Sequence, residues 1–275
     1  MERWKNKFYI SALLLFLLVK AGSYQTKAQC KPEIKAFQTG EELYFDAVYN
    51  WGFIWVNAGK VHFKVEKVPF NGKEVYHFSG FGKSVKKYDW LYTVRDYYDS
   101  WATIPDMKPL KYIRNTSEGQ NKTYNVYTFD YSNNKIYSDT WNTEHAQKLD
   151  TLDLQACLFD IMTAVYYVRT LALSKYKINE KIPVKMIIDN EVYNLYGRYL
   201  GKEQLETHDG KKYNTLKFSI LLVEGTIFKG GEDLVVWITD DNNRVPLLVE
   251  AKILVGTVKA VFTGAKNLLY PLKFE

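Results

Sequence analysis

The sequence predicts a mainly β fold, in which a curved antiparallel sheet forms a barrel-like or spiral single domain. From about residue 41 onward, short segments alternate apolar and polar residues with a period of two, as strands with one buried face do. Turn-forming sequences separate these segments, and the strand-favouring residues Tyr, Phe, Val and Thr are frequent in them. A chain of 275 residues that is 47% hydrophobic can bury a sizeable core, which excludes intrinsic disorder.

Residues 1–28 have the pattern of an export signal. Basic residues precede an apolar run at 10–19 that contains one polar side chain. This run is shorter than the roughly 20 apolar residues of a bilayer-spanning helix, so it predicts a signal peptide. We expect cleavage after Ala28, because small residues stand at the required positions Thr26 and Ala28; residues 21–23 offer an earlier site. No later segment approaches membrane-spanning length, so no membrane span is expected in the mature chain.

Two cysteines, Cys30 and Cys157, follow this signal, and three fates are open for them. In an oxidising compartment they can form a disulfide that closes a long loop. Cys157 can instead be a small buried apolar residue, which its place beside Leu154 and Leu158 in a predicted helix favours. A lipid anchor on Cys30 is the third alternative, and the large Gln29 before it disfavours that modification.

Strand candidates follow one another along most of the chain. Residues 61–66 and 75–78 are expected to form a hairpin, because Asn71-Gly72 suits a two-residue turn in which both residues have positive φ. Turn sequences at 132–134, 189–190, 209–210 and 241–243 separate later segments. Further strands are expected at 91–95, 111–114, 124–129, 135–137, 184–188, 193–199, 213–220, 235–239 and 246–262.

One segment, about residues 151–174, predicts an amphipathic helix instead. Its apolar residues recur at intervals of three and four from Leu154 to Val168, and Thr151 suits the N-cap. A single helix in a strand-rich chain is expected to cover one opening of the curved sheet. No linker or repeat divides the sequence, so residues 29–275 are expected to form one domain, whose lobes 29–148 and 176–275 are joined by the helix.

The sequence contains no complete catalytic or metal-binding motif. Gly80-Phe81-Gly82-Lys83-Ser84 is similar to the end of a phosphate-binding loop, but His stands at position 77, where the motif needs Gly. The four histidines lack metal-ligand spacing, and two cysteines are too few for a zinc cluster. We therefore expect no metal and no other cofactor. The many carboxylates do not single out one catalytic pair.

Aromatic residues make up 16% of the chain, and two clusters are candidate ligand-binding sites. Exposed rings can stack on sugars, and inward rings can line a cavity for an apolar ligand. The alternative, which is the more common role, is that the rings fill the inside of the sheet and pair across strands. The clusters span residues 51–55 and 88–92, and their candidate residues are Trp51, Phe53, Trp55, Trp90 and Tyr92.

The run at 237–250 and its continuation at 256–260 resemble a recurring segment of an uncharacterised family of bacterial envelope proteins, catalogued as domain of unknown function 3108. Residues 40–45, 58–60 and 92–96 resemble its N-terminal strands, and 166–169 resembles the end of its helix. The resemblance covers roughly residues 40–262. It implies a mainly antiparallel, barrel-like or spiral sheet in an exported protein, and it supplies no activity and no catalytic residues.

Four charged residues of the same run are expected to be structural. Asp240 and Asp241 begin a turn, and Arg244 and Glu250 are placed to satisfy charges close to it. We interpret these side chains as part of the turn between two strands rather than as a ligand site.

Together these features predict an exported, non-catalytic protein in the periplasm or associated with the outer envelope. Its expected partner is an apolar or amphipathic ligand or an envelope protein. The alternatives are a carbohydrate-active enzyme or glycan-binding protein, and an assembly scaffold that pairs through an open sheet edge. No nucleic-acid partner is expected, because residues 1–28 contribute +4 of the net charge of +6 and leave only +2 on the rest.

Overall fold

The alternating segments form one sheet of 15 strands, counted over the residues that the structure describes. The structure is a computed structural model that describes residues 31–275 apart from 52–53, 91, 208, 224–229 and 254–255. The strand order is β8-β7-β6-β5-β4-β3-β2-β1-β15-β14-β13-β12-β11-β10-β9. Apart from β8 and β9, which lie at opposite edges, strands that follow one another in the sequence are neighbours in the sheet, and β1 joins the two halves by pairing with β15. The pairs are antiparallel except for the short β9–β10 pair, which is parallel.

Most strands are longer than the sequence segments that predicted them. In the first half they are β1 (Glu42–Trp51), β2 (Ile54–Phe70), β3 (Lys73–Ser84), β4 (Val94–Thr103), β5 (Pro109–Glu118), β6 (Asn121–Asp130), β7 (Lys135–Asn142) and β8 (Lys148–Asp153). In the second half they are β9 (Leu158–Phe159), β10 (Lys181–Ile188), β11 (Glu191–Glu206), β12 (Lys212–Leu222), β13 (Gly231–Thr239), β14 (Pro246–Lys252) and β15 (Thr257–Lys266).

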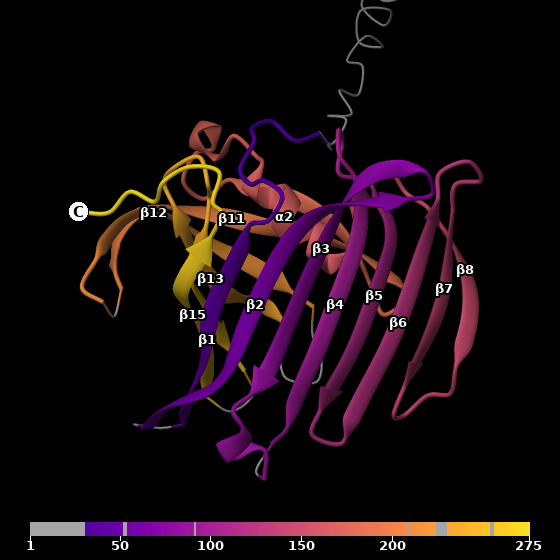
Figure 1. Cartoon of the computed structure of the whole chain (residues 1–275), viewed down its shortest axis with the longest axis horizontal. Helices are drawn as coiled ribbons and strands as arrows, with labels where there is room; N and C mark the ends of the chain where they lie inside the picture. Colours follow the sequence, from indigo (N-terminus) through magenta and orange to yellow (C-terminus); the bar gives the residue numbers. More distant parts are fainter. Residues whose placement is uncertain (1–30, 52–53, 91, 208, 224–229, 254–255) are drawn as a thin grey trace, which may run out of the picture.

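The sheet curves around its own inner face without closing into a barrel. Figure 1 shows β2 to β8 as one wall, with the later strands curving behind it and α2 between the two walls near the upper end. The edges are β8 and the two-residue β9. Lys148, Asp150 and Asp153 place charges along β8, which discourages pairing with another chain. The curved antiparallel fold class is thus confirmed.

One predicted strand is divided in the structure, and one predicted turn is present. Residues 246–262, expected as one strand, form β14 and β15, and Gly256 between them has φ +85°, a conformation that favours glycine. The expected two-residue turn at Asn71-Gly72 is present, with φ of 49° and 76°.

The predicted helix exists but is shorter than 151–174. Helix α2 spans Ile161–Arg169, and residues 148–153 form the edge strand β8 instead. Its N-cap is Asp160, because this side chain accepts a hydrogen bond from the backbone N–H of Thr163; Thr151 lies in β8. The helix contacts β3, β4 and β10. Among the described residues, no helix has both the length and the apolar character to cross a bilayer.

The main core lies between α2 and the inner face of the sheet. Tyr166 of the helix stacks on Phe78 of β3, with ring centroids 4.3 Å apart, and Phe37 meets both rings edge-on. Such contacts fill the interior with aromatic side chains. This is the more common role of aromatic residues in a curved sheet. A second, smaller cluster lies where β1, β12, β14 and β15 come together; its buried members are Leu43, Phe45, Tyr213, Val245, Leu247 and Phe262.

One ion pair is almost completely buried beside the helix. Arg169, at the last turn of α2, donates to both oxygens of Glu41 at 2.6 and 3.0 Å, and the two side chains are 2% and 0% exposed. Its remaining N–H groups donate to the carbonyl oxygens of Asn243 and Ala36. These bonds join the helix to the chain before β1 and to the turn between β13 and β14.

Candidate functional site

A cavity lies beside the C-terminal segment, at the upper end of β12 and β15. Its volume is about 540 Å³. The turn between β11 and β12 forms one side, the end of β15 forms another, and residues 267–274 form the outer wall. Its lining residues are Thr207, Asp209, Lys211, Tyr213, Phe262–Ala265, Asn267–Leu272 and Phe274.

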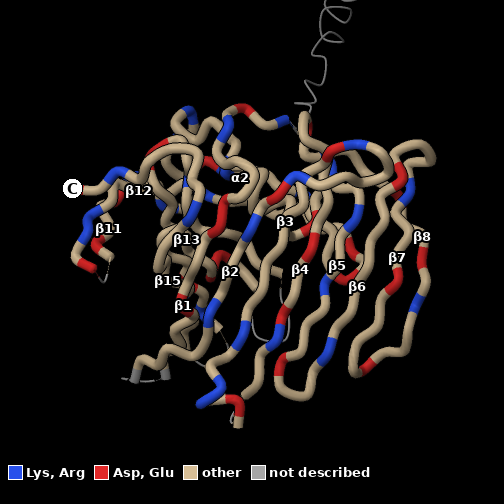
Figure 2. The backbone as a smooth tube through the Cα atoms, in the orientation of Figure 1, with Lys and Arg blue, Asp and Glu red and all other residues tan. Residues whose placement is uncertain are grey.

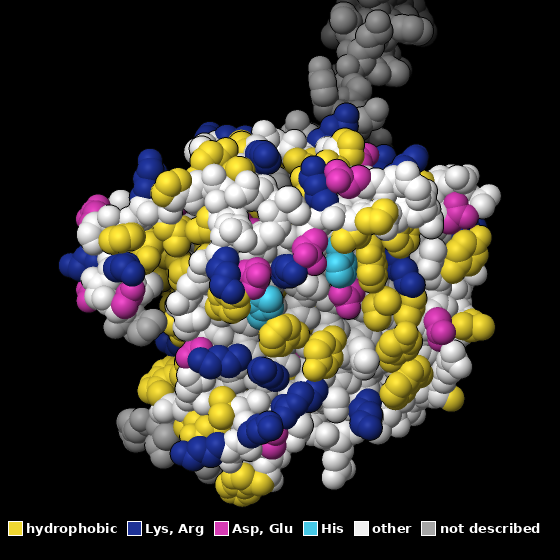
Figure 3. Space-filling model, viewed as in Figure 1, with side chains coloured by type: hydrophobic (Ala, Val, Ile, Leu, Met, Phe, Trp, Pro, Cys, Tyr) yellow, Lys and Arg dark blue, Asp and Glu magenta, His cyan; other side chains and the backbone are white. Residues whose placement is uncertain are grey.

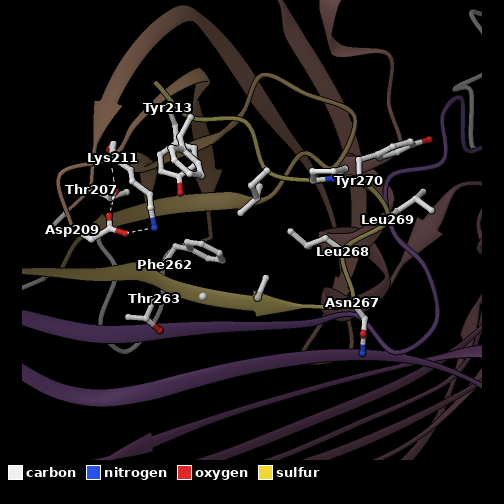
Figure 4. A pocket seen from close by; sticks show the side chains of 15 residues that line it. Thr207, Asp209, Lys211, Tyr213, Phe262, Thr263, Asn267, Leu268, Leu269 and Tyr270 are labelled. Atoms are coloured by element: carbon white, nitrogen blue, oxygen red, sulfur yellow. Dashed lines mark hydrogen bonds and ion pairs between the residues drawn. The ribbon is translucent and has the colours of Figure 1, made fainter.

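The interior of this pocket is apolar because it opens onto the second hydrophobic cluster. Tyr213 and Phe262 are buried members of that cluster, and Leu268 and Leu272 pack against it. In Figure 4, Tyr213 and Phe262 enter the pocket from different walls, whereas Tyr270 and Leu269 point away from its centre. An apolar group of a ligand can therefore contact several side chains that are already held in place by the core.

The outer wall of the pocket is fixed by side-chain hydrogen bonds. Asn243 donates from its amide nitrogen to the Tyr270 carbonyl at 2.8 Å and accepts from the Tyr270 N–H at 2.9 Å. Gln38 donates to the carbonyl oxygens of Asn267 and Leu268. The Glu275 N–H donates to the Lys212 carbonyl at 2.8 Å. These anchors hold residues 267–275 across the sheet without regular secondary structure of their own.

A polar group closes one side of the pocket. Lys211 Nζ lies 2.7 Å from Asp209 Oδ2, and Thr207 donates to Asp209 Oδ1 at 2.6 Å. The hydrogen bond from Lys211 holds the pKa of Asp209 well below its usual range, so the carboxylate is charged. Lys211 also lies 5.1 Å from the centre of the Phe274 ring. The pocket thus joins an apolar interior to an ion pair that can bind a polar headgroup.

A second cluster of ionisable side chains lies on the inner face of β4 and β5. Asp96 shares its face with Ser100, which is fully buried, and it accepts from the Ser117 N–H at 3.2 Å. The carboxyls of Asp96 and Glu118 are hydrogen-bonded to each other. Burial, followed by the charge of Glu118, raises the pKa of Asp96 to about 7. Glycosidases need their two carboxyls roughly 5 Å or more apart, so this pair does not have the geometry of that reaction.

Replacing Asp96 by asparagine is expected to make the protein more stable above neutral pH. The folded-state pKa of about 7 exceeds the ordinary value of 3.8, so folding favours the protonated form, and this contribution is lost as the pH rises through 7. We expect D96N to raise the free energy of unfolding by about 1–2 kcal/mol at about pH 8, after allowance for partial solvent exposure. Urea unfolding at about pH 5 and pH 8 measures it. Asp139→Asn on β7 is the control, and an equal gain at both pH values would contradict the assignment.

A metal ion is held by several side chains that lie close together. Over the part of the chain that the structure describes, no three His, Cys, Asp or Glu side chains are grouped so that they could hold a metal ion.

The family described as "Protein of unknown function (DUF3108)" matches residues 45–263, which is most of the chain. The chain belongs to this family. The finding confirms the resemblance seen in the sequence.

The fold of this DUF3108 protein is also found in a solved structure. The crystal structure of a beta-barrel-like protein of domain of unknown function DUF1849 from Brucella abortus is similar, with a TM-score of 0.53. The similarity covers 86% of this chain and 100% of that chain at 8% sequence identity, so it concerns the fold alone. No curated protein matches the DUF3108 chain.

The structure of the DUF3108 protein places the predicted aromatic candidates outside the pocket. Trp55, Trp90 and Tyr92 are 50%, 82% and 47% exposed and lie at the opposite end of the strands, near the β1–β2 and β3–β4 connections. Phe53 and the side chain of Trp51 lie outside the described residues. The structure therefore brings three of the five candidates to one end of the sheet, away from the pocket beside residues 267–274.

The predicted turn residues support the pocket indirectly. Asp241 Oδ1 accepts from the N–H groups of Asn243 and Arg244 and from the Thr239 hydroxyl, and this holds Asn243 where it anchors Tyr270.

The other charged residues of that run form ion pairs. Arg244 Nη1 lies 3.3 Å from Asp240 Oδ1, and Glu250 pairs with Lys259 of β15 at 2.8 Å.

Cys157 does not occupy a helix. It lies in the turn before β9 with φ 59°, it is half-buried, and it is disulfide-bonded. Cys30, the other cysteine of the chain, lies outside the described residues.

Sequence reasoning did not find the residues that line the pocket. Residues 267–274 have no strand or helix periodicity, and they approach the β11–β12 turn only through the fold. The one available signal was Asp209-Gly210, which marks that turn but does not indicate what lies beside it.

Proposed function

We propose that this DUF3108 protein is an exported protein of the cell envelope that binds an amphipathic ligand without performing a chemical step on it. The observation that carries the proposal is the pocket of about 540 Å³ between residues 267–274 and the sheet. Small-molecule sites typically measure roughly 300–1,000 Å³ and combine apolar walls with a few polar groups. The pocket has both, because its apolar interior ends at the ion pair of Lys211 and Asp209.

The orientation of the ligand follows from this polarity. Its apolar part lies against Phe262 and Tyr213, where burial of apolar surface stabilises the complex. Its headgroup lies beside Lys211 and Asp209, which together can contact a zwitterionic or neutral polar group.

The envelope part of the proposal rests on residues 1–28. Their basic residues and the short apolar run that follows are typical of a signal peptide. The rest of the chain has a formal charge of only +2, which gives it no general affinity for polyanions.

A tryptophan at Gly264 is expected to displace the ligand. Gly264 lines the pocket, and a Cβ at this position meets no atom within 4 Å, so a large side chain can occupy the cavity without a clash at its base. The natively isolated protein is extracted with organic solvent, and the extract is analysed by mass spectrometry. We expect a bound amphipathic species in the unsubstituted protein and its loss, by about tenfold or more, in Gly264→Trp.

The control carries the same substitution on an exposed position of the outer face. Thr128→Trp on β6 leaves the pocket unchanged, so we expect it to retain the ligand. Thermal unfolding of both variants establishes that they fold. A ligand-free native protein that also fails to bind a fluorescent fatty-acyl probe would contradict the proposal.

A further inference from the structure

The end of the sheet opposite the pocket carries exposed aromatic rings from two neighbouring connections. Trp90, in the β3–β4 connection, is 82% exposed, and Trp55, at the start of β2, is 50% exposed. The Val85 N–H donates to the Ala58 carbonyl at 2.9 Å, which ties the start of the β3–β4 connection to the first part of β2. Trp55 and Lys86 each lie within a few residues of this bond, so both belong to one rim of the sheet.

This rim also carries unneutralised positive charge. Residues 83–95 contain four basic residues and one acidic residue, Asp89, and Asp89 is already paired with Arg95 at 2.6 Å. Lys86 and Lys87 lie just before Trp90 in the short 3₁₀ helix η1 (Lys86–Tyr88). Lys87 Nζ is 5.4 Å from the centre of the Tyr88 ring, and Asp89, which Arg95 already pairs, is the acidic residue that the charge of Lys86 reaches. Figure 2 shows Lys and Arg at the lower ends of these strands, and Figure 3 shows basic and hydrophobic side chains gathered on the surface there.

Other contacts keep the rings in position without covering them. Lys259 Nζ lies 4.7 Å from the centre of the Trp55 ring, and its charge is balanced by Glu250. Tyr92 lies against Gly119, where a Cβ would come within 2.7 Å of its ring, yet this tyrosine is still 47% exposed. Because no described group buries the Trp90 ring, its apolar surface is accessible to another molecule or to a membrane.

We propose that this rim, defined by Trp55, Lys86, Lys87, Trp90 and Tyr92, docks the protein on the surface of an anionic phospholipid membrane. Tryptophan and tyrosine favour the membrane–water interface, because their rings are apolar and their N–H or O–H groups remain hydrated. Lysines next to the rings are attracted by anionic headgroups. A fluid interface accepts a projecting ring such as Trp90 without a shaped pocket, which a small ligand would need.

The proposal does not depend on the pocket, which lies at the other end of the strands. It assigns to the rim a peripheral membrane contact, in which the strand ends near the β1–β2 and β3–β4 connections face the membrane. The pocket would then face away from the membrane, so loss of the pocket ligand and loss of membrane binding are separable results.

Vesicle flotation tests the docking. The isolated protein is mixed at low salt with vesicles of phosphatidylcholine alone, or of phosphatidylcholine with about one third phosphatidylglycerol. We expect binding to the anionic vesicles and little to the neutral ones. The double variant Lys86→Gln/Lys87→Gln should bind the anionic vesicles about 25-fold more weakly, at about fivefold per lysine, and Trp90→Ala about five- to tenfold more weakly.

Matched controls lie away from the rim. Lys73→Gln is at the opposite end of β3, and Tyr131→Ala removes an aromatic ring that is 37% exposed in the turn between β6 and β7, at the same end of the sheet as Lys73. Both should bind as the unsubstituted protein does. Since residues 1–28 are the same in every protein compared, differences among them report the rim.

Three outcomes would overturn the assignment. The first is no binding of the unsubstituted protein to anionic vesicles, and the second is equal binding by the rim variants. The third is retention of Trp90-dependent binding on an insoluble polysaccharide while the vesicles stay unbound, which would assign the rim to a glycan. Quenching of tryptophan fluorescence by brominated lipid, lost in Trp90→Ala, would show directly that this ring enters the interface.

Discussion

Replacing Arg169 by methionine is expected to lower the free energy of unfolding by about 3–5 kcal/mol. The substitution leaves the Glu41 carboxylate, which is fully buried, without the two hydrogen bonds and the positive charge that now balance it. It also removes donors to the carbonyl oxygens of Asn243 and Ala36. The free-energy cost of leaving a buried charge unpaired is larger than the free energy gained by packing a methionine side chain there. Urea unfolding followed by fluorescence measures the difference.

Two comparisons make this prediction specific. Arg198→Met removes the partner of Glu232 from a partly exposed pair, and it should cost only about 0–1 kcal/mol. The double variant Arg169→Met/Glu41→Leu removes both buried charges, so we expect it to be more stable than Arg169→Met alone. A loss below about 1 kcal/mol for Arg169→Met would show that the buried pair contributes little to stability.

The same ion pair joins three of the segments that carried the family resemblance. Residues 40–45 contain Glu41, 166–169 contain Arg169, and 237–250 contain Asn243, whose carbonyl accepts from Arg169. Far apart in the chain, these residues meet at one point beside the helix. The resemblance could be recognised from local sequence, but the meeting point could not, because it depends on how β1, β13 and β14 follow one another around the sheet.

The strands could be predicted because alternation and turn residues are local signals. Asn71-Gly72 has the positive φ values that its sequence demands, and the register of β2 with β3 follows from that turn. Such local signals do not predict the curvature of the sheet or the edge strand β8. Lys148–Asp153 alternates too briefly, and the apolar spacing after Leu152 fits a helix equally well.

The candidate site was less predictable than the fold. The aromatic clusters around Trp55 and Trp90 were visible in the sequence, and the structure exposes them on one rim. The pocket depends instead on irregular residues 267–274, which are held by Asn243 and Gln38. The pairing of Asp96 with Glu118 likewise depends on the register of β4 with β5, in which Val94 lies opposite Glu118.

The start of the helix could not be predicted from local spacing. The apolar pattern that begins at Leu154 favoured Thr151 as the N-cap. The structure uses Asp160 because its carboxylate meets Ser100 of β4 as well as the first turn of α2. A contact with a distant strand decided the boundary, and no property of the helix sequence contains that information.

Replacing Asp160 by alanine is therefore expected to destabilise the protein by about 2–4 kcal/mol near pH 5. The fully buried carboxyl accepts from the Thr163 N–H at 2.9 Å, the Thr163 hydroxyl at 2.8 Å and the Ser100 hydroxyl at 2.7 Å. Alanine removes the helix cap and leaves these donors without that acceptor in the core. Asp160→Asn keeps an oxygen for the Thr163 N–H, so its loss should stay near 1 kcal/mol.

The pH dependence distinguishes this role from simple loss of packing. Burial raises the pKa of Asp160 to about 6, above its ordinary value of 3.8, so the folded state binds the proton more tightly than the unfolded state. The stability that this carboxyl contributes is full below about pH 4 and falls as the pH rises through 6. The deficit of Asp160→Ala should accordingly be about 1 kcal/mol smaller at about pH 7.5 than at about pH 5. Urea unfolding of both proteins at the two pH values measures this change, and a deficit that grows with pH would mean that Asp160 is ionised and stabilised by charge in the folded protein.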